Sequence, residues 1–242
     1  VEFSDELAAR EPHIRERLGD IVGKPFSRFA IELFDFEQVR PIYLQHGYMR
    51  VQFATPIARF TGDPSKPLAS TVLVIVKIDP GPVYKFGIIT WSGNKAVPSE
   101  ELAAASGMAN GEPADGMKIE AGWDKARLAL GRHGYLDAKV DPEASFDEAA
   151  KTVSYKVSVA EGTQYHMGEM VLTGLSLEAE RRLLGAWRLE KGVVFDRAYY
   201  DEFVDHGAKA SFGDLPFHYE KFGHFLRTNP QNATVDVLLD FQ

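Results

Sequence analysis

A cassette of glycines around one tyrosine occurs twice in this chain, and it constrains the fold more than any other feature. In each copy the pattern Gly-x-x-Tyr-x-x-Gly is followed by an aliphatic stretch and a further glycine, and a His-Gly-Tyr tripeptide precedes each copy. Such a repeat, with a period of about 80 residues, indicates an array of similar small modules. The matching positions are Gly81, Tyr84, Gly87 and Gly93 in the first copy and Gly162, Tyr165, Gly168 and Gly174 in the second.

The period divides the 242 residues into three modules, each long enough to bury a core of its own. We expect boundaries at residues 1–82, 83–162 and 163–242. The spacing from tripeptide to cassette differs between the copies, and an insert-like segment at residues 61–67 accounts for this, since surface loops absorb length changes at little cost. With 45% hydrophobic residues the chain has ample material for three cores.

The middle module shows the plan most clearly. β-Branched and aromatic residues predict a strand at 84–91, and apolar positions at helical spacing predict a helix around Ile119, Trp123, Ala126 and Leu130. A first helix is expected at 98–107, further strands at 136–140 and 152–160, and an acidic loop at 141–150. The order is therefore strand, helix, helix, strand, strand. This is an α+β module in which two helices cover one face of a three-stranded mixed sheet.

The outer modules follow this plan with departures. In the first, we expect helices at 5–18 and 26–45 and strands at 49–60 and 70–79, with the initial strand truncated to residues 1–3 because the chain is a fragment that lacks about seven residues of it. In the third, we expect strands at 164–172, 217–227 and 233–241 and helices at 176–189 and 196–206. Because Gly207 follows Gly192 so closely, the second helix of the third module is predicted to be shortened.

Composition excludes several functional classes. A net charge of −8 with scattered basic residues argues against nucleic acid as a partner. Without cysteine there is no disulfide, thiol nucleophile or thiolate metal site. His46, His133 and His206 each precede a glycine, which indicates helix capping, and His218 with His224 lacks further ligands for a metal. No catalytic residue, cofactor or metal site is predicted.

The repeated cassette, the Gly-Tyr that closes the second helix and the order of elements resemble tandem POTRA domains. These are periplasmic modules of the outer-membrane barrel assembly and translocation family that includes BamA and TamA. The resemblance spans nearly the whole chain, and it implies a non-catalytic periplasmic scaffold. It also implies that unfolded outer-membrane polypeptides and accessory lipoproteins or chaperones bind the scaffold, and that a membrane β-barrel follows it.

An exposed strand edge offers unpaired backbone groups to an incoming extended chain. In POTRA-like sheets the second strand is expected at an edge, and its residues are our candidate polypeptide-binding site. The alternative is that these edges are merely solvated, and that their polar side chains prevent pairing with another strand. The candidate residues are Met49, Arg50, Val51, Gln52 and Phe53 in the first module and Leu136, Asp137, Ala138, Lys139 and Val140 in the second.

Three other functions stay open at this point. The first is the periplasmic arm of a two-partner secretion transporter, although that group resembles a pair of modules. The second is an enzyme on a repeated α+β scaffold, for which the sequence offers no cluster of titratable residues. The third is a structural cell-envelope adaptor of the division-protein type.

Overall fold

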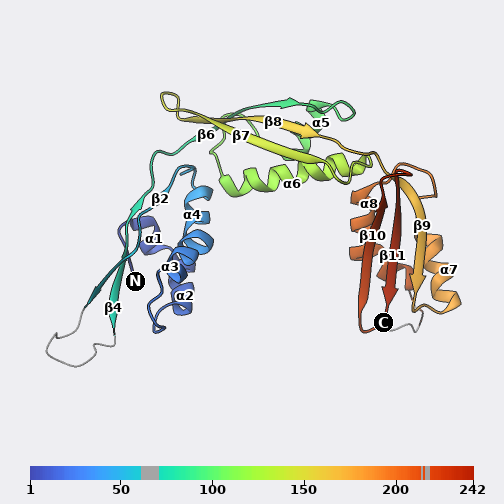
Figure 1. Ribbon diagram of the computed structural model, residues 1–242, viewed down its shortest axis with the longest axis horizontal. Coiled ribbons are helices and arrows are strands. Elements are labelled where there is room, and N and C mark those ends of the chain that lie inside the picture. The colour runs from blue at the N-terminus through green and yellow to red at the C-terminus, as the bar shows by residue number, and fades with distance from the viewer. Residues whose placement is uncertain (61–70, 214, 216–218) are drawn as a thin grey trace. The chain divides into compact units, whose positions relative to one another are not determined.

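Each predicted module contains a three-stranded sheet in the computed structural model (Figure 1). The structure describes residues 1–60, 71–213, 215 and 219–242. The predicted insert at 61–67 and His218 lie outside these residues. In chain order the strands of the sheets pair as first–third–second: β1-β4-β3, β6-β8-β7 and β9-β11-β10. The α+β plan and the edge position of the second strand are confirmed.

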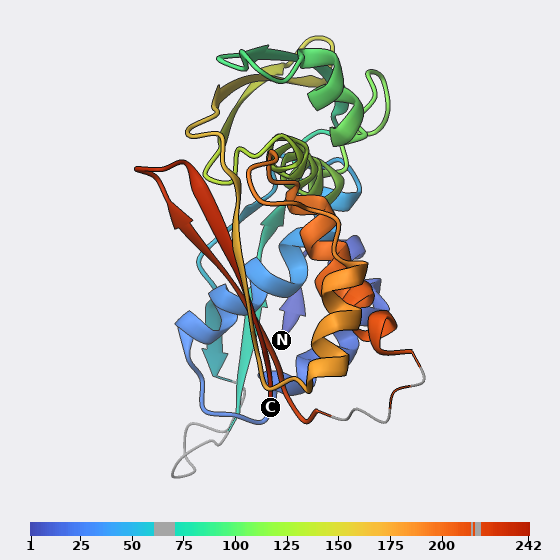
Figure 2. The ribbon, with the colours of Figure 1, turned by 90° about the vertical axis from the view of Figure 1, so that its right-hand side faces the viewer.

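The third module has a continuous core between its sheet and its helices. The central strand β11 runs antiparallel to β10 and parallel to β9, and every second residue of β11 is buried. Figure 2 shows the helices stacked against one face of this sheet. The elements are β9 His166–Thr173, α7 Leu177–Ala186, α8 Arg197–Glu202, the π-helix η3 Phe203–Gly207, α9 Ala208–Phe212, β10 Phe222–Asn229 and β11 Thr234–Phe241.

The predicted shortening of the second helix is wrong. Gly207 has a helical φ of −65° and does not end the helix, which continues through α9 to Gly213, where φ is 56°. The glycine instead makes room for the ring of Phe203, because a Cβ at residue 207 would lie 2.7 Å from that ring. His206 therefore lies inside a helix rather than at its end.

The middle module places the repeated glycines where side chains do not fit. A Cβ on Gly87 would lie 2.3 Å from the Ser154 hydroxyl, and one on Gly93 would lie 2.2 Å from the carbonyl oxygen of Val159. These glycines let β6 approach the central strand β8 closely. The elements are β6 Lys85–Ser92, α5 Ser99–Ser106, α6 Gly116–Arg132, β7 Lys139–Asp147 and β8 Thr152–Ala160.

The acidic stretch predicted as a loop belongs mostly to β7. The strand extends to Asp147, and the turn occupies the residues that follow it. Most side chains of β7 are exposed, so they lack the apolar alternation by which a strand is predicted. By contrast, β8 alternates buried and accessible residues and has the predicted bounds, 152–160.

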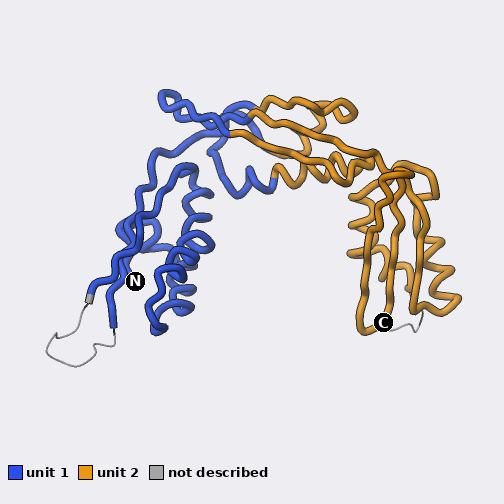
Figure 3. Tube along the Cα trace, in the orientation of Figure 1, with its two compact units in different colours: residues 1–88, 108–121, 144–155 blue, residues 89–107, 122–143, 156–242 orange. Residues whose placement is uncertain are grey.

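The residues of the chain pack into two compact units (Figure 3). One unit holds residues 1–88, 108–121 and 144–155, and the other holds residues 89–107, 122–143 and 156–242. The middle module thus contributes to both units, and the predicted module boundaries stay a prediction. Within the described residues, no helix is long and apolar enough to cross a membrane.

In the first module Pro12 breaks the first predicted helix, because proline cannot supply the N–H that a continuing helix needs. The second predicted helix is continuous, with a π-helical turn in its middle. The predicted strand at 49–60 is interrupted around Pro56. The elements are β1 Glu2–Phe3, α1 Glu6–Arg10, α2 Pro12–Arg17, η1 Leu18–Asp20, α3 Arg28–Phe34, η2 Asp35–Val39, α4 Arg40–Gln45, β2 Gln52–Phe53, β3 Ile57–Phe60, β4 Val72–Val76 and β5 Ile78–Asp79.

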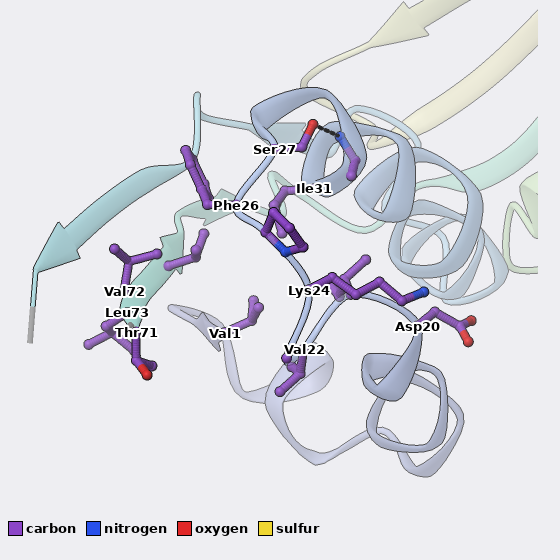
Figure 4. Close-up of a pocket in the computed structure, with 15 residues that line it drawn as sticks. Val1, Asp20, Val22, Lys24, Phe26, Ser27, Ile31, Thr71, Val72 and Leu73 are labelled. Carbon is purple, nitrogen blue, oxygen red and sulfur yellow. Dashed lines mark hydrogen bonds between the residues drawn. The ribbon is translucent and has the colours of Figure 1, made fainter. Parts of the chain in front are cut away.

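The short β1 leaves a groove along β4. Within the described residues, β1 pairs in parallel only with Ile75 and Val76. Beside residues 72–74 lies a groove of about 960 Å³ (Figure 4), bounded on its other side by the segment that leads into α3. Val1, Val22, Phe26 and Ile31 line it. The first strand of the middle module has 8 residues against 2 in β1.

We expect the amides of β4 to exchange with solvent at least ten times faster than those of β11 under native conditions. The reason is that β11 is flanked by paired strands along nearly its whole length, whereas β4 is flanked on both sides only near its end. Hydrogen exchange followed by NMR measures this difference. Equal protection of the two strands in a monomeric sample would contradict it.

Candidate polypeptide-binding edges and module junctions

The strand β7 offers the longest outer edge in the middle module. It lies at the end of the order β6-β8-β7, so one side pairs with β8, and no strand among the described residues pairs with the other side. Nine residues long, it is exposed along most of its length. The strands β3 and β10 hold the same outer position in the first and third modules. A row of unpaired N–H and C=O groups is what an extended polypeptide needs for strand addition.

Only part of the predicted edge in the middle module is strand. Leu136, Asp137 and Ala138 lie in the turn that follows α6, where the N–H of Leu136 donates to the carbonyl of Gly134 (3.1 Å). The turn arises because Gly134, with φ of 83°, ends the helix in the left-handed conformation. Lys139 and Val140 begin β7, and Val140 is buried.

In the first module Met49, Arg50 and Val51 likewise follow a glycine turn, at Gly47, and are not strand. Gln52 and Phe53 form β2, which pairs with β5 in a two-stranded sheet apart from the main sheet of the module. The outer strand of the main sheet is β3, which begins at Ile57. Pro56 could have predicted that the strand expected at 49–60 is interrupted, since proline lacks the N–H that a sheet ladder uses.

Arg50 contributes to the junction between the first and middle modules. Its Nη1 donates to Glu148 Oε1 (2.7 Å), and the hydroxyl of the buried Tyr84 donates to the same oxygen (2.8 Å). The ring of Phe146 lies under the Arg50 guanidinium, 5.4 Å away, and meets the Tyr84 ring edge-on. The N–H of Tyr84 also donates to the carbonyl of Gly47 (2.9 Å).

The junction between the middle and third modules repeats the backbone contact, but its carboxylate comes from the preceding module. The N–H of Tyr165 donates to the carbonyl of Gly134 (2.8 Å), and its hydroxyl donates to Asp137 Oδ2 (2.8 Å). Tyr165, like Tyr84, is fully buried. In both places the tyrosine of the cassette therefore joins the Gly-Tyr turn of the preceding module and a carboxylate. The repeated sequence pattern thus encodes a module junction.

Comparison with known proteins identifies the middle module. Residues 84–162 match the POTRA family, described as surface antigen variable number repeat. This segment is therefore similar to a POTRA domain. A putative outer membrane protein assembly factor from Treponema pallidum is 26% identical over 179 residues, which cover 73% of this chain and 21% of the relative. The chain thus spans about a fifth of that relative's length.

Solved structures show that the POTRA fold extends through the chain. POTRA domains 3–5 of BamA from Haemophilus influenzae match with a TM-score of 0.61 at 22% identity, covering 91% of this chain and 83% of theirs. BamA from Haemophilus ducreyi lacking POTRA domains 1–3 matches with a TM-score of 0.52 at 20% identity, covering 66% of this chain and 29% of that one. The modules are therefore similar in fold to the POTRA domains of BamA.

Protonation of Glu148 is expected to loosen the junction between the first and middle modules only at strongly acidic pH. The hydrogen bond from Tyr84, followed by those from Lys151 and Arg50, lowers the pKa of Glu148 from 4.5 to about 2. Since the folded pKa is below the unfolded one, the stabilising contribution is complete above about pH 5 and disappears as the pH falls toward 2. NMR titration of the carboxyl carbon measures the pKa directly. A midpoint near 4.5, or an unchanged profile of junction contacts in Glu148→Gln, would contradict the assignment.

Four histidines have structural partners. His46 Nδ1 lies 2.7 Å from the carbonyl oxygen of Ile42, consistent with the predicted helix-capping role. His133 instead pairs with Glu101 (2.7 Å), and His206 lies 3.5 Å from Glu202. His224 contacts the Tyr200 hydroxyl (3.0 Å). In the described part of the chain, no three His, Asp or Glu side chains gather as a metal site.

Proposed function

We propose that this chain is a non-catalytic periplasmic scaffold of an outer-membrane β-barrel assembly protein, and that its POTRA modules comprise residues 1–82, 83–162 and 163–242. Its outer edge strands bind unfolded outer-membrane polypeptides by strand addition, accessory assembly proteins dock on the scaffold, and a membrane β-barrel follows in the parent protein. The observation that carries the proposal is the unpaired outer side of β7. The name of the Treponema relative, an outer membrane protein assembly factor, supports the assembly role.

Pro142 indicates which groups of β7 face outward. Proline has no N–H, so within an edge strand it occupies positions whose backbone points to solvent. The N–H and C=O of one residue point to the same side, and those of its neighbours point to the opposite side. Val140, Ala144 and Phe146 therefore share the outward direction with Pro142, while the residues between them face β8. The outward donors of β7 lie mainly beyond Pro142, past the predicted residues.

Strand addition is a suitable way to bind unfolded outer-membrane polypeptides, which can all form β-strands but have little sequence in common. Backbone hydrogen bonds supply affinity without reading side chains, each contributing about 0.5–1.5 kcal/mol net. Asp141 and Glu143 are exposed on β7 and keep this edge soluble when it is unoccupied. The edge is thus available to a client strand and guarded against pairing with another copy of itself.

A proline at position 144 tests the proposal. Ala144→Pro removes an outward donor and leaves the ladder to β8 intact, while Ala144→Val keeps the donor in an equally exposed position. We expect the proline variant to bind an unfolded outer-membrane β-strand peptide about five- to tenfold more weakly than wild type, as loss of one hydrogen bond requires. The valine variant is expected to bind like wild type. Equal affinities of the two variants, with unchanged circular dichroism, would refute strand addition at β7.

A further inference from the structure

A row of exposed apolar side chains follows the second helix of the first module, away from the strand edges. Phe29, Leu33 and Phe36 recur at helical spacing and are 72%, 41% and 62% exposed. Residues at positions i, i+4 and i+7 lie on one face of a helix. Contiguous exposed apolar surface of this kind marks an interaction site more often than chance exposure does. These three residues are called the α3 stripe below.

A pocket beside the α3 stripe contains a buried carboxylate. The pocket has a volume of about 290 Å³, and Phe36 belongs both to its wall and to the stripe. Asp35 also lines it, is only 3% exposed, and has no hydrogen-bond partner among the described residues for either carboxylate oxygen. The carboxylate belongs to the π-helical turn η2, and such turns are frequent at functional sites.

The charge of Asp35 is not compensated by the residues around it. Arg40 lines the pocket, but its guanidinium stacks over the Phe36 ring at 5.5 Å and makes no ion pair with Asp35. Glu32, on the same helix, adds a second negative charge, and β2 with the residues after it contributes only Phe53, Ala54 and Thr55. Burial, and next the charge of Glu32, raise the pKa of Asp35 to about 7. A buried carboxylate is costly unless a cation pairs with it.

We propose that the α3 stripe and the Asp35 pocket together bind an amphipathic helix of a partner protein, which inserts a lysine into the pocket. The partner's apolar face covers Phe29, Leu33 and Phe36, in the helix-in-groove mode. The lysine's methylene stem contacts Phe36 and Phe53, and its ammonium group pairs with Asp35. This surface lies on different elements from the outer strand edges, so it serves a second partner independently of strand addition.

Three capped helical peptides test this proposal at pH 8, where Asp35 is ionised. All three carry leucines at helical spacing among neutral polar residues, and they differ at one central position: lysine, norleucine or glutamate. We expect the lysine peptide to bind at least tenfold more tightly than the norleucine peptide, and the glutamate peptide to bind most weakly. NMR shifts are expected at Asp35, Phe36, Phe53 and Thr55. Equal affinities of the three peptides for wild type, or no binding of any of them at millimolar concentration, would overturn the proposal.

Variants locate the two halves of the site. Asp35→Asn is expected to remove the preference for lysine over norleucine, and Phe36→Ser to weaken all three peptides at least fivefold. Phe225→Ser, on β10 and with a similar exposure of 64%, is the matched control and is expected to change nothing. Ala144→Pro is also expected to leave these affinities unchanged, so failure of strand addition and failure of this site are separable. A lysine preference that persists in Asp35→Asn would place the cation elsewhere and overturn the assignment.

Discussion

Replacing Gly174 with alanine is expected to lower the free energy of unfolding of the third module by about 3–5 kcal/mol. Two effects add in this variant. The residue has a φ of 78°, where a side chain is strained, and the new Cβ would lie 1.6 Å from the carbonyl oxygen of Phe241. Because that carbonyl belongs to the last residue of β11, the end of the central strand has to move away from β9.

Gly192→Ala separates strain from collision. Gly192 has a similar φ of 88°, but beyond its chain neighbours no atom lies within 4 Å of the Cβ that alanine would add. Only backbone strain is then expected, about 1–2 kcal/mol. Urea unfolding of protein labelled with fluorotryptophan reports the third module through Trp187, its one tryptophan. Similar losses in the two variants would show that the close approach at Gly174 contributes nothing to stability.

Replacing Tyr165 with alanine is expected to lower the free energy of unfolding by about 3–5 kcal/mol, the usual cost of deleting a buried aromatic side chain. The ring is 1% exposed and packs in the core of the third module. Its hydroxyl also donates to Asp137 at the module junction. The loss is therefore expected to appear together with weaker protection of the turn that contains Asp137.

Tyr165→Phe is the control, because it keeps the ring and removes only the hydroxyl. Loss of that hydrogen bond is expected to cost about 1–2 kcal/mol. The same urea unfolding, combined with hydrogen exchange at the Asp137 turn, measures both variants. If the phenylalanine and alanine variants lose equal stability, the hydrogen bond rather than the packed ring dominates, contrary to the structure.

The repeated cassette made most of the fold predictable from the sequence, because backbone geometry requires glycine at several of its positions. Gly87, Gly93, Gly168 and Gly174 all lie where a Cβ would meet the neighbouring strand or its side chains. Only glycine fits at these positions, so the same glycine pattern occurs in each copy. This repeat in the sequence indicates the modules. The order of elements and the edge position of the second strand follow from the same plan, and both are confirmed.

Two features that the sequence did not predict, the helix that continues past Gly207 and the strand β7, have causes in single residues and short segments. Gly207 resembles the helix-ending Gly47 and Gly134, but it adopts a helical φ, and its missing Cβ leaves room for the Phe203 ring. The dipeptide alone does not distinguish these roles. The strand in the acidic stretch of β7 escaped prediction because its side chains are almost all exposed, so the hydrophobic pattern is absent. The strand predicted at 136–140 consequently lies too early in the chain, since β7 is Lys139–Asp147.

Asp35 shows a further limit. The sequence predicts that one aspartate inside an apolar helical stretch is solvated, but Asp35 lies in the π-helical turn and is buried together with Phe34 and Val39. Burial, not spacing, singles out this residue. Glu148 escaped prediction for another reason, because its partner Arg50 lies 98 positions away in the sequence.

Strand addition at β7 is tested most directly by a backbone-amide NMR titration of the whole chain with an unfolded outer-membrane β-strand peptide, using a scrambled polar peptide as the control. The account predicts shifts concentrated at the outward amides of Ala144 and Phe146, together with new protection of these two amides from exchange. The scrambled peptide is expected to produce neither effect. Absence of shifts along β7 at millimolar peptide, or equal shifts with both peptides, would contradict the account.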